Sequence, residues 1–84
     1  MKIKIRHGEN YIIYSFDIEN EEALIIENNS NDLLDNIFAD RDYYGIKNWL
    51  INRCGGKKTI KEVLDLCKIN KGASVVDKIR IEIM

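Results

Sequence analysis

The residues of this chain that could do chemistry are few and widely spaced. His7 is the single histidine, and Cys54 and Cys67 are the two cysteines. Any Ser-His-Asp or Cys-His pair would have to include His7, which lies in a predicted turn. A zinc site needs closely spaced ligands, and the chain has no Cys-x-x-Cys pair, so we expect both thiols to be small core residues. The pattern favours a protein that is not an enzyme and that needs no cofactor or metal.

A glycine- and lysine-rich segment, GGKKT at residues 55–59, is the nearest approach to a phosphate-binding loop. Such a loop requires G-x-x-x-x-G-K followed by Ser or Thr, directly after a strand. Here Lys58 interrupts the motif, position 51 is Ile, and the preceding element is a predicted helix. A DNA-reading helix-turn-helix fits loosely, because the buried Ile60 falls one residue early and one residue rotates a helix by about 100°. We therefore expect a plain connection between helices.

Acidic residues gather between Asp17 and Asp42. This segment holds nine Asp and Glu against one base, net −8, while the rest of the chain carries twelve Lys and Arg against five acids, net +7. The formal net charge of −1 therefore hides a dipolar molecule. Asp35, Asp40 and Asp42 are close in sequence, but the spacing of a calcium-binding loop is absent, and we expect no metal. The segment is interpreted as a surface.

Two interpretations of this acidic surface stay open: a solvated face, or an anionic patch that docks on a basic surface of a partner protein. Asp32 and Asp35 are explained by a helix start, where the macrodipole favours anions. The other acids near the turns have no such explanation, and Tyr is enriched at binding hot spots. The predicted partner-binding residues are Glu19, Glu21, Glu22, Asp40, Asp42, Tyr43 and Tyr44, with one of the two tyrosines exposed.

A basic face of the predicted sheet is the alternative binding site. Its cations alternate with isoleucines at period two on the first and last strands, so they share one face and could follow the phosphates of a nucleic acid. Tyr11 is the aromatic residue expected on the same side. The residues of this alternative are Lys2, Lys4, Arg6, Lys78 and Arg80.

Two local resemblances accompany these patterns. Tyr43-Tyr44-Gly45 followed by Trp49 resembles the start of the acidic helix of barstar-type ribonuclease inhibitors, and this resemblance implies a partner with a cationic active site. The pattern Trp49-Leu50-x-x-Arg53, with 64–68 (LDLCK), is similar to the small N-terminal module of some HipA-type kinases. That resemblance implies an accessory module of a toxin–antitoxin system.

The elements that must position these residues follow from periodicity. Alternation predicts strands over 2–6, 11–18 and from Val76 to the C-terminus, with a third strand or a helical turn over 23–26. Apolar spacing predicts helices starting near Asp32, over 43–53 and from Ile60, the last after a capping box. The order β-β-β-α-α-α-β predicts a single α+β domain over residues 1–84, with a mostly antiparallel sheet of three or four strands and helices on one face.

Composition narrows the setting. Ile, Asn and Lys, which have AT-rich codons, make up 33 of the 84 residues and point to an AT-rich bacterium, or to a phage or mobile element living in one. Two thiols do not make a disulfide scaffold, and the start of the chain alternates instead of forming a signal peptide's apolar block. No apolar run approaches the roughly 20 residues that cross a bilayer. We expect a cytoplasmic protein without membrane contact, acting as an inhibitor or binding module.

Overall fold

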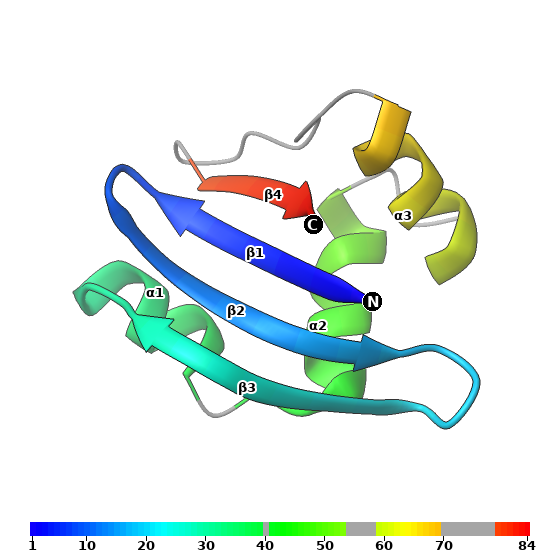
Figure 1. The fold of residues 1–84 in the computed structure, drawn as a ribbon, viewed down its shortest axis with the longest axis horizontal. Coiled ribbons are helices and arrows are strands. Elements are labelled where there is room, and N and C mark those ends of the chain that lie inside the picture. Colours follow the sequence, from blue (N-terminus) through cyan, green and yellow to red (C-terminus); the bar gives the residue numbers. More distant parts are fainter. Residues whose placement is uncertain (40, 54–58, 70–78) are drawn as a thin grey trace.

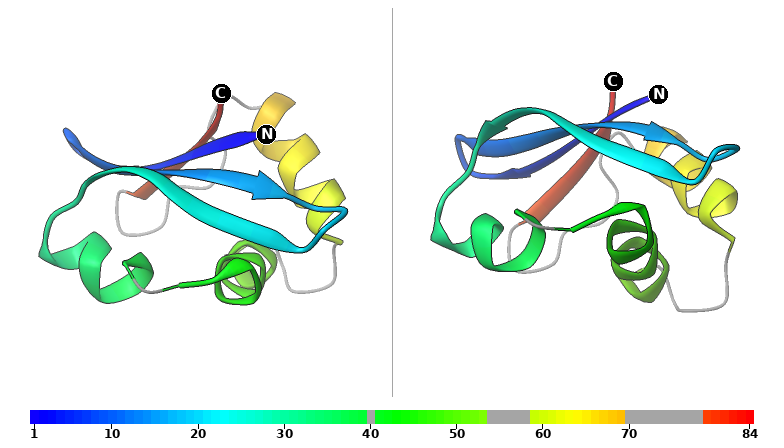
Figure 2. Two further views of the ribbon diagram at one scale, coloured as in Figure 1. Left: turned by 60° about the horizontal axis from the view of Figure 1, so that its bottom comes forward. Right: turned by 90° about the horizontal axis from the view of Figure 1, so that it is seen from below.

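Four antiparallel strands form one sheet in the order β3-β2-β1-β4 (Figure 1). The computed structural model describes residues 1–39, 41–53, 59–69 and 79–84. The described helices lie on one side of the sheet (Figure 2), so the predicted α+β class and element order are confirmed. The elements are β1 (Lys2–His7), β2 (Asn10–Asp17), β3 (Glu22–Asn29), α1 (Asp32–Phe38), α2 (Tyr43–Arg53), α3 (Ile60–Ile69) and β4 (Ile79–Ile83).

The alternation of apolar residues decides which face of the sheet is buried. Residues opposite each other in the register share a face, and Ile3 pairs with both Tyr14 and Ile83. The helices cover this face with their own apolar stripes, including the fully buried Leu34 and Ile46. The core is Ile3, Ile5, Ile12, Tyr14, Phe16, Leu34, Phe38, Tyr43, Ile46, Leu50, Ile60, Val63, Leu64, Ile79 and Ile81.

The β1–β2 hairpin closes through two residues, Gly8 and Glu9, between the paired His7 and Asn10. Gly8 has φ of +64°, while Glu9 is not in the left-handed region. A positive φ at the first central position alone is the geometry of a type II′ turn, which matches the twist of the flanking strands. The glycine is therefore required at this position, and the predicted hairpin is confirmed.

Side-chain caps determine where two of the helices begin. Asn31 accepts a hydrogen bond from the Leu34 backbone N–H at 3.1 Å, and its amide nitrogen lies 2.8 Å from Nδ1 of His7. Asn31 therefore caps α1 and ties its start to the end of β1. The predicted capping box of α3 is present, because the Thr59 and Glu62 side chains each accept from the other residue's backbone N–H.

The C-terminal end of α1 is anchored to the sheet and to the next helix. Tyr14 donates its hydroxyl to the Phe38 carbonyl at 2.7 Å, and burial raises the pKa of that hydroxyl. The Arg41 backbone N–H reaches the same carbonyl at 3.0 Å, and its Nε donates to the Ile37 carbonyl at 2.6 Å. These bonds satisfy carbonyls that a helix end leaves without partners. The joint between α1 and α2 is thereby fixed.

The third strand differs most from its prediction. The sequence predicted a short strand over 23–26 with a helical turn as the alternative, whereas β3 runs from Glu22 to Asn29. Pairing with β2 is interrupted by a bulge opposite Ile13 and Tyr14. The polar residues after Ile26 extend the strand because backbone pairing with β2 does not require apolar side chains. Lys78, Cys54 and the start of the predicted last strand lie outside the described residues.

Candidate partner-binding site

The turn between β2 and β3 presents acids at one end of the sheet. Asp17 accepts hydrogen bonds from Asn20, from the side-chain amide at 2.7 Å and the backbone N–H at 3.1 Å. These bonds hold the pKa of the Asp17 carboxyl below its usual value. Glu21 follows with φ of 54°, which is a left-handed conformation that glutamate rarely adopts. The turn therefore keeps a strained glutamate where glycine or asparagine would fit more easily.

The start of α2 brings a second group of polar residues to the same place. Asp42 accepts from the Gly45 backbone N–H at 3.0 Å, and its carbonyl accepts from the Ile46 N–H at 3.1 Å. Asp42 is therefore the N-cap of α2. Tyr43 is only 3% exposed, and its ring stacks on Phe16 with 4.7 Å between ring centroids. This stack fixes the first turn of the helix against β2.

Tyr44 links the two segments on the surface. Its ring is 51% exposed and packs edge-on against Tyr43, with 5.3 Å between the ring centroids. Its hydroxyl donates a hydrogen bond to the Glu21 carboxylate, which raises the pKa of Tyr44 together with the negative charge of Glu21 itself. A residue of the β2–β3 turn thus contacts a residue 23 positions later. We call Glu19, Glu21, Glu22, Asp42 and Tyr44 the acidic corner.

A groove of about 390 Å³ runs between the start of β3 and the start of α2. Carboxylates and a phenol line it together with apolar side chains, so it suits a long cation with an aliphatic stem. The lining residues are Glu21, Glu22, Ala23, Leu24, Asp42, Tyr43 and Tyr44. Five of these seven were predicted as partner-binding residues from the sequence.

The charges of the acidic corner are not neutralised by ion pairs. None of the acids of 17–42 that the structure describes forms a salt bridge. Asp17 and Glu22 are directly opposite in the β2–β3 register, and like charges in such a pair are unfavourable. The Lys47 ammonium lies 5.7 Å from the centre of the Tyr44 ring. Within the described residues, the net negative charge of the corner is therefore retained.

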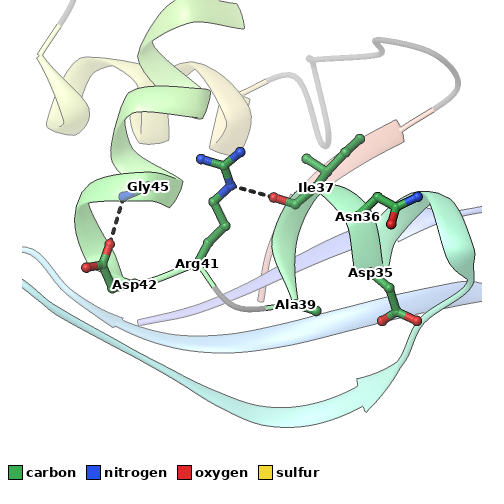
Figure 3. Close-up of a pocket in the computed structure, with 7 residues that line it drawn as sticks. All are labelled: Asp35, Asn36, Ile37, Ala39, Arg41, Asp42 and Gly45. Carbon is green, nitrogen blue, oxygen red and sulfur yellow. Dashed lines mark hydrogen bonds between the residues drawn. The ribbon is translucent and has the colours of Figure 1, made fainter.

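A second cavity, of about 310 Å³, lies between the C-terminal end of α1 and the start of α2 (Figure 3). Asp35 and Asp42 line it, but so does Arg41, whose guanidinium is the cation among its lining residues. Gly45 is needed here because a Cβ at this position would lie 2.8 Å from Cδ of Arg41. This cavity is better explained as part of the joint between α1 and α2 than as a second binding site.

The predicted partner-binding residues lie in different environments in the structure. Glu19, Glu21 and Glu22 lie on the exposed β2–β3 turn and at the start of β3, and Glu21 meets Tyr44 across the groove. The expectation that one of the adjacent tyrosines is exposed is confirmed, and it is Tyr44. Tyr43 is a core residue, and it contributes to the site by packing beneath the exposed ring of Tyr44. Asp40 lies outside the described residues.

One interpretation of the acids needs correction. The sequence offered no structural explanation for Asp42, yet the structure gives it one, because its carboxylate caps α2. The predicted helix start at Tyr43 already implies this role, because the first backbone N–H groups of a helix need an acceptor from the residue that precedes it. The backbone N–H of Glu19 bonds to Asp17, but the Glu19 and Glu22 carboxylates have no hydrogen-bond partner among the described residues. Their charges are therefore the ones that remain without a structural role.

Sequence reasoning missed the apolar part of the site. Leu24 lines the groove and is 66% exposed, and Ile26 is 48% exposed. The signal was present in the run Ala23-Leu24-Ile25-Ile26, because consecutive residues of a strand cannot all face one core. An unbroken apolar run in a strand with a single covered face leaves about half of its side chains in solvent.

The predicted basic face is present in the structure, but its positive charge is partly neutralised. Lys2, Lys4 and Arg6 share one face of the sheet with Tyr11, as predicted, and Arg80 is opposite Arg6. Arg6 forms an ion pair with Glu82 at 3.0 Å. The Lys4 ammonium lies 4.5 Å from the centre of the Tyr11 ring, and a hydrogen bond to Glu27 raises the pKa of Tyr11. This face is therefore a network of mixed charges.

Within the described ranges, no three or more His, Cys, Asp and Glu side chains are grouped so that they could hold a metal ion. Among the helices that the structure describes, none combines the length and apolar character needed to span a membrane.

Comparisons of the chain with protein-family models, with curated proteins and with solved structures found no significant match. The resemblances to barstar-type inhibitors and to HipA-type modules therefore stay limited to the residues that carry them.

Proposed function

We propose that this chain is a small non-catalytic protein-binding module whose acidic corner docks on a basic surface of a partner protein. The observation that carries the proposal is the contact between Glu21 and Tyr44, which joins two distant acidic segments around one groove. The surrounding carboxylates form no salt bridge with any residue that the structure describes, so a cationic partner would find them available. Complementary potentials of this kind speed association and select the partner.

One cost within the corner supports a binding role over a merely solvated face. Glu21 occupies a left-handed conformation, which is unfavourable to folding. Strained residues persist most often where a function needs them. The half-exposed ring of Tyr44 adds the type of side chain that anchors protein interfaces.

The partner class that suits this surface is an enzyme acting on nucleic acids. Such enzymes hold basic grooves for phosphates, and an array of carboxylates occupies the same sites without being cleaved. The chain would then act as an inhibitor, encoded by a phage or a mobile element. Its high content of Ile, Asn and Lys, which have AT-rich codons, agrees with that setting.

The test is affinity capture from cells of the source organism, followed by titration of the captured protein against matched charge variants. Glu19→Lys with Glu22→Lys reverses two acids that have no internal partner. Glu9→Lys with Asp65→Lys makes the same change in net charge at two exposed sites on other elements. We expect the first variant to bind about 100-fold more weakly, from about 1.5 kcal/mol for each charge, and the control to change affinity less than about threefold.

Two outcomes would contradict the proposal: equal effects of the two double variants, or an affinity that does not fall as salt rises. Surface charge interactions are screened within a Debye length of about 8 Å at physiological ionic strength, so a strong salt dependence is required.

Nucleic-acid binding through the basic face is the second candidate, favoured by the position of Tyr11 beside Lys4. A phosphate-following face should bind generic DNA or RNA at micromolar levels in low salt, and Lys2→Glu with Lys4→Glu should abolish that binding. An anisotropy titration without detectable binding would rule this candidate out.

A further inference from the structure

β3 is an edge strand with an unusual number of exposed apolar side chains. The sheet order gives it one strand neighbour, β2, and Figure 1 shows its other edge at the margin of the sheet. Leu24 is 66% exposed, Ile25 39% and Ile26 48%. Alternate backbone N–H and C=O groups of such a strand point away from the sheet, where another strand could pair with them.

The usual protection of an edge strand is incomplete on β3. Natural edges carry lysine or proline or lie beneath a helix, and the sequence of β3, EALIIENN, contains neither residue. In Figure 2 the described helices lie below the face of the sheet and not along the outer edge of β3. One protective feature is present, a bulge in the pairing with β2 near Ile13. The ends of the apolar run are marked by Glu22 and Glu27.

Charge argues against a second copy of the chain as the occupant of this edge. Antiparallel pairing of two β3 strands that overlaps their apolar centres brings Glu22 and Glu27 of one copy beside those of the other. No base within β3 compensates them, and like charges opposite each other destabilise a sheet. A strand with lysine or arginine at both ends of an apolar centre would instead find a carboxylate at each end.

The groove of the acidic corner continues this edge. Leu24 belongs to both, and Tyr44 and Asp42 lie beside the start of β3. A segment paired along β3 would therefore extend one of its ends over the groove. A basic side chain at that end would meet Glu21 and Asp42 while its aliphatic stem lies along Leu24.

We propose that the outer edge of β3 accepts an extended basic segment of the partner protein as an added strand, with apolar side chains over 24–26 and cations opposite Glu22 and Glu27. The basic character of the segment rests on the proposed function of the acidic corner. Main-chain hydrogen bonds supply affinity in this mode of recognition, and side chains at alternate positions supply specificity.

The experiment uses two peptides and amide NMR of the full chain. The first is KKVVVKK, blocked at both ends; the second is the same peptide N-methylated at alternate residues, which keeps the charge but removes the donors along one edge. We expect KKVVVKK to shift the amides of 22–27 and to slow their hydrogen exchange. We expect the N-methylated peptide to bind about 100-fold more weakly, since at least three donors are lost and each lost hydrogen bond costs about 1 kcal/mol.

A protein variant provides the reciprocal test. Leu24→Ser with Ile26→Ser leaves the charge unchanged and alters two exposed side chains, so the fold is retained. It should weaken KKVVVKK binding about tenfold, at about 25 cal/mol per Å² of apolar surface no longer buried. Ser15→Ala, on the central strand opposite Leu24, is the control and should leave the affinity unchanged.

Failure of this inference is distinguishable from failure of the proposed function. Equal binding of both peptides, with shifts confined to the acidic corner, would overturn strand addition and leave electrostatic docking in place. No binding of either peptide would also overturn strand addition, while the Glu19 and Glu22 reversals would still decide the proposed function. A dimer seen by sedimentation and abolished by the Leu24 and Ile26 changes would show that a second copy occupies the edge.

Discussion

The acidic corner and the basic face of the sheet carry similar numbers of charges but hold them differently. On the basic face, Arg6 has an ion pair with Glu82, and Lys4 lies over the ring of Tyr11. In the acidic corner, Glu21 bonds to a neutral tyrosine and Asp42 to backbone N–H groups. One region satisfies its charges internally, and the other leaves its net charge facing solvent.

This difference in how the charges are held indicates which of the two surfaces is available to a partner. A partner of the basic face would compete with the Arg6–Glu82 pair, at a small cost because both side chains are partly exposed. A cationic partner of the acidic corner would meet carboxylates that have no salt bridge among the described residues. Both regions contain a tyrosine that donates to a glutamate, so the contrast comes from the cations and not from the aromatic residues.

The largest expected effect comes from removing the support of the acidic corner. Phe16 is 1% exposed and stacks on Tyr43, so Phe16→Ala should lower the free energy of unfolding by about 3–5 kcal/mol in chemical denaturation. Phe16→Leu retains the fold with a smaller loss. In that variant the Tyr44 hydroxyl should titrate closer to its ordinary value, and an unchanged titration would show that the stack does not position the corner.

A smaller effect, of opposite sign, is expected from relieving strain at Glu21. Holding glutamate in the left-handed conformation costs about 1–2 kcal/mol. Glycine removes this strain, but its larger conformational entropy in the unfolded state lowers the free energy of unfolding by about 0.5–1 kcal/mol. Relative to Glu21→Ala, which also lacks the hydrogen bond from Tyr44, Glu21→Gly should therefore raise the free energy of unfolding by about 0.5–1 kcal/mol, and both variants should lower affinity for the partner. A variant that is more stable and binds equally well would separate the strain from function.

The ion pair of the basic face should matter less. The Arg6 and Glu82 side chains are 35% and 27% exposed, and surface pairs are screened by solvent. Arg6→Ala should change the free energy of unfolding by less than about 0.5 kcal/mol, and added salt should reduce the difference. A loss above about 1 kcal/mol would contradict the interpretation of the Arg6–Glu82 contact as a weak, solvent-screened ion pair.

The smallest effects are expected from the two tyrosine–glutamate hydrogen bonds. Both Tyr11 and Tyr44 have a pKa raised above the ordinary 10.0. Because the folded-state pKa is raised, the stabilisation is complete below pH 10 and is lost as pH rises above it. Glu21→Gln should lower the pKa of Tyr44 and leave Tyr11 unchanged, and Glu27→Gln should do the reverse, as measured by ultraviolet titration of each phenol.

Much of the fold was predictable because its signals are local. The capping box at Thr59 and Glu62, the glycine turn at Gly8 and the alternation of isoleucines on β1 and β4 each depend on residues within a few positions. The length of β3 was not predictable, because its last residues are strand only through pairing with β2. Strand propensity is a property of each residue by itself, so it does not predict pairing between the end of β3 and β2.

The candidate site shows the same division. The sequence by itself determined the concentration of acids between Asp17 and Asp42 and the exposure of one tyrosine of an adjacent pair, since neighbours on a helix cannot face the same way. Only the tertiary structure decided that Tyr44 meets Glu21 and that Tyr43 is buried against Phe16, whereas the Asp42 cap is a local contact three residues along the chain. The two tyrosine contacts depend on how α2 packs against the sheet, and packing joins residues whose separation along the chain carries no signal.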